Sequence, residues 1–349
     1  MLPLRARVLP LLCVFLGAPI AAEYLQAYLP FTGEVWMSLF GIAFFAPLYG
    51  GAALLIREIS VRTRVGWSGT LILAAAFGLA MTGIVDLSMF GEDRGDVAYW
   101  AELREPTLIE PLGLSVAATL NWTAGHVMMS IGAPLALLYA LAPAHRGRPL
   151  LGKVGIPLTV AAAAVVALAV HSDGQSAYGY TLSVGRAAAV LAVVVVIIAA
   201  AFLVSRRSGG DHGGAGAGRM LPAAAVVAAA VAFKVLVDLM PSTWIGLSGT
   251  VLVLAGGGLI LWWASTRRRW GARDIGLVGI GLVIGAILIG FLAPVPDGVP
   301  VVAKLAQSSV LLVLAGCLLV VVIRRTNRER TSKLTRWPRG WEAPAFPGG

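Results

Sequence analysis

The sequence predicts an all-α membrane protein, a bundle of about ten transmembrane helices. Three observations predict this fold class: the length of the apolar stretches, the distribution of Lys and Arg, and the positions of the aromatic residues. Ten apolar stretches are close to the roughly 20 residues that a helix needs to cross the hydrocarbon layer. They are 8–28, 35–56, 67–90, 113–141, 154–171, 187–205, 220–240, 244–265, 275–293 and 301–323.

The composition excludes a water-soluble fold. Of the 349 residues, 58% are hydrophobic and only 13% are charged, with a mean hydropathy of +0.85. A soluble globular domain carries about 25% charged residues, so this chain has too few charges to cover a surface in water. The first stretch, 8–28, also resembles the apolar core of a signal peptide, but Pro19 and Ile20 fit the cleavage rule poorly.

The basic residues fix the predicted orientation. Of 27 Lys and Arg residues, 22 lie in the N-terminal tail, in every second loop and in the C-terminal tail. This asymmetry is the positive-inside pattern, and it predicts that both termini are cytoplasmic. The net charge of +10 does not indicate nucleic acid, because the basic residues form short clusters beside the apolar stretches. The predicted partners of these clusters are anionic lipid head groups.

Aromatic residues support the same topology, because Trp and Tyr favour the two membrane interfaces. The outer interface is marked by Tyr24, Tyr28, Trp36, Tyr99, Trp100, Tyr178, Tyr180 and Trp244. The inner interface is marked by Trp67, Trp262, Trp263 and Trp270. The bias toward Ala, Gly, Val and Arg is typical of a GC-rich bacterial genome and favours the plasma (cell) membrane as the location.

The domain organisation follows from these stretches. Residues 1–323 are expected to form one transmembrane domain, and 324–349 a basic cytoplasmic tail without stable structure. The Gly/Ala-rich segment 206–219 is typical of a flexible linker. The acidic segment 91–112 is the one substantial external loop, with room for a short interfacial helix near 97–103. It is interpreted either as a solvated loop or as a vestibule that attracts cations or binds a partner.

Small and ring-containing residues predict how the helices pack. Pro19, Pro47 and Pro134 lie within apolar stretches, where each removes a backbone hydrogen bond and kinks its helix. Gly281 and Gly285 form a small-xxx-small face that allows a neighbouring helix to approach closely. The two cysteines, Cys13 and Cys317, are expected to be small buried hydrophobic residues.

Ionisable residues within the membrane are costly and are therefore the candidates for a functional site. Six candidate residues are predicted to fall in the outer half of the membrane: Glu23, Asp86, Asn121, His126, Lys234 and Asp238. If the helices bring them together, they would line a polar cavity open to the outside. Such a cavity would bind a small solute, or relay a proton through His126 and a carboxylate.

Each candidate also has a structural explanation. Glu23 and Asp86 lie close enough to the interface to be solvated by head groups. Lys234 and Asp238, four residues apart on one helix, are expected to pair, with the lysine reaching outward. Asn121 and His126 would then hydrogen-bond a neighbouring helix.

Three functional classes remain open at this point. The first is a permease-like protein, in which Asp86 and His126 face one cavity. The second is a structural or partner-dependent membrane subunit, in which these groups point to separate neighbours. The third is a membrane-embedded enzyme, in which Glu23, Asp86 and His126 reach one point. Because the chain holds no recognised hydrolase, phosphate-loop, zinc-protease or dinucleotide motif in a sensible context, the sequence favours a non-enzymatic protein without cofactor or metal.

Overall fold

The apolar stretches of the chain form helices, since a helix satisfies every backbone hydrogen bond within its own segment. The computed structural model describes residues 2–95, 97, 99–207 and 218–335. Within them, nine helical segments are long and apolar enough to cross a membrane. They are Leu4–Tyr24, Val35–Thr63, Gly66–Val85, Val116–Leu141, Gly155–Tyr178, Val184–Ser205, Trp244–Arg267, Ala272–Leu292 and Val301–Glu329. The predicted all-α polytopic bundle is thus confirmed.

The one predicted stretch not among these nine, 220–240, is also a helix, α10 (Ala223–Leu239), of 17 residues. At ~1.5 Å per residue it is about 26 Å long, close to the thickness of the hydrocarbon layer. The other long helices are α1 (Leu4–Pro19), α2 (Val35–Phe45), α3 (Gly51–Thr63), α4 (Gly66–Ala80), α6 (Val116–Gly125), α7 (Ala133–Leu141), α8 (Gly155–Tyr178), α9 (Val184–Arg207), α11 (Trp244–Arg267), α12 (Ala272–Leu292) and α13 (Val301–Thr335).

Each of the first four spans contains a π-helical segment. These segments are η1 (Ile20–Tyr24), η2 (Ala46–Gly50), η3 (Met81–Val85) and η6 (His126–Gly132). Three of them adjoin or contain the prolines that the sequence predicted to distort their helices: Pro19, Pro47 and Pro134. A proline removes one backbone donor, and a wider turn is one way in which a helix accommodates that loss.

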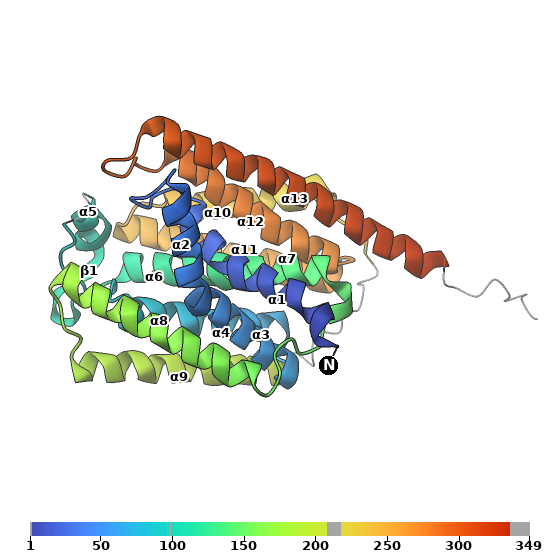
Figure 1. The fold of residues 1–349 in the computed structure, drawn as a ribbon, viewed down its shortest axis with the longest axis horizontal. Coiled ribbons are helices and arrows are strands. Elements are labelled where there is room, and N and C mark those ends of the chain that lie inside the picture. The colour runs from blue at the N-terminus through green and yellow to red at the C-terminus, as the bar shows by residue number, and fades with distance from the viewer. Residues whose placement is uncertain (1, 96, 98, 208–217, 336–349) are drawn as a thin grey trace, which may run out of the picture.

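Helix α12 lies in the packed centre of the bundle, against α7, α10 and α13 (Figure 1). Its glycines permit this packing, as the sequence predicted for Gly281 and Gly285. A Cβ at Gly281 would lie 2.6 Å from the Cβ of Ala230, and one at Gly285 would lie 2.8 Å from the Cβ of Lys234. Larger side chains at either position would therefore push α10 away.

The N-terminus and the end of α13 lie at one end of the bundle, on the right in Figure 1. Hydrogen bonds join the basic segments there: Arg57 donates to the carbonyls of His145 and Arg148, and Arg62 donates to that of Leu151. We call this the basic end, defined by the end of α3, segment 142–153 and the end of α13. Helix α5 and strand β1 lie at the opposite end.

The acidic segment 91–112 is more structured than its composition suggested. It contains α5 (Trp100–Arg104), which overlaps the short helix expected near 97–103 but ends one residue later, and the short turns η4 (Glu105–Thr107) and η5 (Glu110–Leu112). Strands β1 (Leu108–Ile109) and β2 (Leu114–Ser115) pair antiparallel, with Leu108 opposite Ser115. At the basic end, η7 (Pro143–His145) follows α7.

Three expectations differ from the structure or fall outside it. Helix α13 continues to Thr335, so residues 324–335 are helical and not an unstructured tail, while 336–349 lie outside the described residues. Most of the predicted linker, 208–217, also lies outside them. Cys13 and Cys317 are exposed on the protein surface, since each lies on an outward face of its helix.

Candidate functional site

The Glu23 carboxylate is held by two tyrosines. Its two oxygens accept hydrogen bonds from the hydroxyls of Tyr28, in the loop after the first span, and Tyr49, in the second span. Tyr49 is buried, whereas Tyr28 is 38% exposed. Glu23 itself is partly buried, so its charge is compensated on the inner side by Tyr49 and reaches the surface beside Tyr28.

The local backbone explains how Glu23 and Tyr49 meet. Glu23 lies on η1 and Tyr49 on η2, so both side chains project from π-helical turns. Helix α1 crosses η2 at Gly50, where an added Cβ would collide with the carbonyl of Phe15. A glycine is therefore required there for the first two spans to approach this closely.

His126 begins η6 and packs directly against this pair. Its ring is stacked on that of Tyr49, with centroids 5.8 Å apart and an angle of 25° between the planes. The edge of Phe77 closes another side at 5.6 Å. The Nδ1 atom of His126 lies 2.9 Å from the Oγ of Ser130, one turn along the same helix. His126 thus contacts the tyrosine that binds Glu23 and has a hydroxyl partner of its own.

Asp86 lies directly after η3, where its Oδ1 accepts a hydrogen bond of 2.8 Å from the backbone N–H of Ser88. The charges of Glu23 and Arg94 both act on it. Arg94 stacks on the ring of Tyr178 at 5.4 Å and donates to its hydroxyl. No hydrogen bond or ion pair joins Asp86 to Glu23 or to Tyr49 within the described residues, and the hydrogen bond to Ser88 fixes its side chain locally.

Lys234 and Asp238 form a separate group on α10. They make the ion pair that their spacing predicted, but Lys234 is only 2% exposed and does not reach outward. Asp238 also accepts a hydrogen bond of 2.9 Å from the Nε2 atom of Gln26. Because Gln26 follows Glu23 by three residues, the loop after the first span connects the two polar groups.

Asn121, on α6, stands apart from both groups. Its Oδ1 atom is buried and has no hydrogen-bond partner among the residues that the structure describes. The six candidates thus divide into Glu23 and His126, which both contact Tyr49, Asp86 beside Ser88, the pair on α10, and Asn121. We call the first group, with Tyr28 and Tyr49, the Glu23 site.

Arg104, on α5, holds segment 91–112 closed at the end of the bundle opposite the basic end (Figure 1). Arg104 is only 3% exposed, and its guanidinium donates to the carbonyls of Gly91 and Gly113, the latter at 3.0 Å. Burial lowers the pKa of Arg104 below its usual range, and the charge of Glu92 opposes that shift. These bonds bring the two ends of the loop together next to Trp100, whose indole N–H also donates to Gly91.

Tyr49 and Phe77 were not among the sequence candidates, and Tyr28 was interpreted only as an interface marker. Tyr49 did carry a signal, since a tyrosine hydroxyl inside an apolar stretch usually has a hydrogen-bond partner. Its proximity to Pro47 was a second signal. Phe77 carried none, because phenylalanine is ordinary in a membrane helix.

Chemically, the Glu23 site is a carboxylate that accepts hydrogen bonds from two hydroxyl groups. The ionised form is an acceptor at both oxygens, whereas a protonated form becomes a donor at one of them. Protonation would therefore require one tyrosine to turn away or to become an acceptor. A comparison of the chain with protein-family models, with curated proteins and with solved structures found no significant match to any of them.

Proposed function

We propose that the protein is a permease-like membrane protein that moves a proton, alone or together with a small solute, by way of the Glu23 site. The single observation that carries the proposal is the bonding of Glu23 by Tyr28 and Tyr49. An acidic residue among membrane helices is costly, and such residues commonly serve as proton or ion sites in transporters.

The π-helical turns support this proposal. Glu23, Tyr49 and His126 all lie on such turns, and π-helical segments are frequent at functional sites. In the proposed cycle, protonation of Glu23 breaks one tyrosine bond and lets η1 and η2 separate. Loss of the proton restores both bonds. The site therefore has two hydrogen-bonding arrangements, which an alternating-access protein requires.

His126 is the proposed second proton carrier. Imidazole exchanges protons near neutral pH, and this ring contacts Tyr49 on one side and Ser130 on the other. In the proposed transfer, protonated Glu23 gives its proton to the Tyr49 oxygen while the Tyr49 O–H proton passes to a ring nitrogen of His126, and the stacked rings must shift for the hydroxyl to reach that nitrogen. The positive-inside pattern supports access to Glu23 from the outside of a bacterial plasma membrane, beside the exposed Tyr28.

Proton flux into liposomes tests the proposal. The full chain is reconstituted with a pH-sensitive dye inside the vesicles, and a potassium diffusion potential drives protons across the membrane. We expect Glu23→Gln to reduce the protein-dependent flux by about tenfold or more, since the amide cannot take up the proton. Glu34→Gln is the matched control, because Glu34 is an exposed glutamate near the same end of the bundle.

If the protein moves protons only together with its solute, the flux assay shows no protein-dependent signal. Infrared titration of the same samples then tests directly whether Glu23 takes up a proton. A protonated carboxyl band should appear on acidification and be absent in Glu23→Gln. Equal flux in all three proteins, together with a carboxyl band that Glu23→Gln leaves unchanged, would rule out the Glu23 site as a proton carrier.

A further inference from the structure

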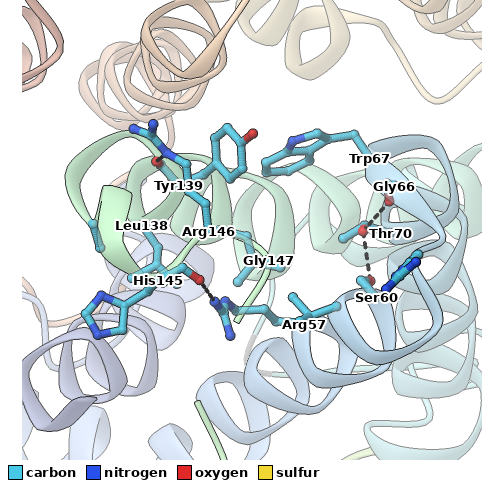
Figure 2. A pocket seen from close by; sticks show the side chains of 14 residues that line it. Arg57, Ser60, Gly66, Trp67, Thr70, Leu138, Tyr139, His145, Arg146 and Gly147 are labelled. Carbon is cyan, nitrogen blue, oxygen red and sulfur yellow. Dashed lines mark hydrogen bonds between the residues drawn. The ribbon is translucent and has the colours of Figure 1, made fainter. Parts of the chain in front are cut away.

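A cavity of about 480 Å³ lies at the basic end, far from the Glu23 site. It is an open cavity lined by residues of α3, the start of α4, α7 and segment 142–147 (Figure 2). Its volume is in the range of small-molecule sites. The residues described as lining it include Arg57, Arg64 and Arg146 but no carboxylate. Glu58 and Glu329, which pair with Arg57 and Arg146, do not line the cavity, so its wall presents positive charge and is suited to an anion.

Two of the arginines are fixed parts of the wall. The Nη2 atom of Arg57 donates to the carbonyl of His145 at 2.7 Å, and the guanidinium is paired with Glu58. Arg146 bonds Glu329 at 2.8 Å and stacks on the ring of Tyr139 at 5.0 Å. These contacts use most of the donors of both side chains, so their main effect is to shape the cavity and add to its potential.

Arg64 differs from the other two. It is exposed, and it makes no hydrogen bond or ion pair with any residue that the structure describes. Its backbone has a φ of 57°, a left-handed conformation that ends α3 and turns the chain into α4. The five donors of its guanidinium are available to a ligand at the mouth of the cavity.

The start of α4 adds to the positive potential. Gly66 and Trp67 line the cavity, and the first turn of this 15-residue helix contains no acidic residue. Free backbone N–H groups at a helix N-terminus favour an anion. Part of the lining is apolar: Trp67 and Tyr139 pack edge to face at 5.7 Å (Figure 2), and Leu135 and Leu138 also line the cavity.

We propose that this cavity binds a phosphate group, with Arg64 as the side chain that contacts it. The arginines and the start of α4 match a phosphate, for which the planar guanidinium is well suited. The aromatic and leucine wall matches the apolar part of the molecule that carries it. Two sources share this chemistry: an anionic phospholipid of the adjacent leaflet and a soluble phosphate ester. The proposal is independent of the function assigned to the Glu23 site.

Lipid binding to the purified full chain in detergent tests the proposal by native mass spectrometry. The probes are phosphatidylglycerol, phosphatidylcholine and inorganic phosphate. We expect phosphatidylglycerol to bind about tenfold more tightly than phosphatidylcholine, and Arg64→Asn to reduce that preference by about fivefold or more. Asparagine tolerates the left-handed backbone at this position, so the variant should fold.

Arg267→Asn is the matched control, because Arg267 is an exposed arginine at the end of α11 and does not line the cavity. A loss confined to Arg64→Asn supports the site and a lipid source. Displacement of the lipid by millimolar inorganic phosphate, again lost in Arg64→Asn, supports the site and a soluble source. The same binding in wild type and Arg64→Asn, or the same loss in both variants, would overturn the proposal.

Discussion

The Tyr49 hydroxyl donates a hydrogen bond to the Glu23 carboxylate, which joins the interior of the second span to the end of the first. Both residues lie on π-helical turns, and the bond is buried on the side of Tyr49. A charged acceptor makes such a bond stronger than one between neutral groups. The same bond therefore stabilises the bundle and sets the proton affinity that the proposed function requires.

We expect Tyr49→Phe to lower the free energy of unfolding by about 1.5–3 kcal/mol, the usual contribution of a hydrogen bond to a charged group. The phenyl ring keeps the packing against His126, so the loss reports on the hydroxyl. Thermal or denaturant unfolding in micelles measures it. Tyr139→Phe is the control, because the Tyr139 hydroxyl makes no hydrogen bond within the described residues, and its change should stay within about 0.5 kcal/mol. Equal effects in the two variants would contradict the assigned bond.

Arg104 should control the opening of the external loop. In Arg104→Gln the carbonyls of Gly91 and Gly113 lose their shared donor, and the two ends of the loop separate. Hydrogen exchange across 91–115 should become about tenfold faster or more, since local opening then costs less free energy. Glu102→Gln, an exposed change on the same helix, should leave the exchange rates as they are. Protection that survives in Arg104→Gln would show that other contacts hold the loop.

The pair on α10 predicts a non-additive result. Asp238→Asn leaves the buried Lys234 ammonium without its counter-charge and should cost about 3–5 kcal/mol of stability. The double variant Lys234→Met with Asp238→Asn removes both charges and should be more stable than Asp238→Asn alone. The new amide oxygen can still accept from Gln26 in both proteins. A double-mutant cycle measures the coupling, and simple additivity would mean that the two charges do not stabilise each other.

These residues also show how far the sequence alone reaches. The fold class could be predicted because the length of an apolar stretch is a local property. The ion pair between Lys234 and Asp238 could be predicted for the same reason, since a helix places residues four positions apart on one face. The extension of α13 to Thr335 could not be predicted from the sequence. A polar segment with good helix formers carries no local signal for where the helix ends.

The Glu23 site could be predicted only in part. Glu23 and His126 are conspicuous as ionisable residues in apolar stretches. Their neighbours depend on how separate spans pack, which is fixed by contacts such as that between Gly50 and Phe15. No spacing along the chain encodes such a contact. This is why the carboxylate was identified and Tyr49, its buried hydrogen-bond partner, was missed.

The orientation of the bundle gives the last prediction. The basic end should face the cytoplasm and α5 the outside, as the distribution of Lys and Arg indicates. Single cysteines at two exposed positions report on the two ends: Glu102→Cys on α5 and Arg267→Cys at the end of α11. In intact cells, a membrane-impermeant maleimide should label Glu102→Cys and should label Arg267→Cys only after permeabilisation.

Both native cysteines are exposed on the protein surface, so the two reporters need a background with Cys13→Ala and Cys317→Ala. This cysteine-free protein is also the negative control, because it should not be labelled by the maleimide before or after permeabilisation. Labelling of Arg267→Cys alone in intact cells would show that the bundle has the opposite orientation to the predicted one. The Glu23 site would then lie on the cytoplasmic side. The direction of the proposed proton movement would then be reversed, because Glu23 would take up its proton from the cytoplasm.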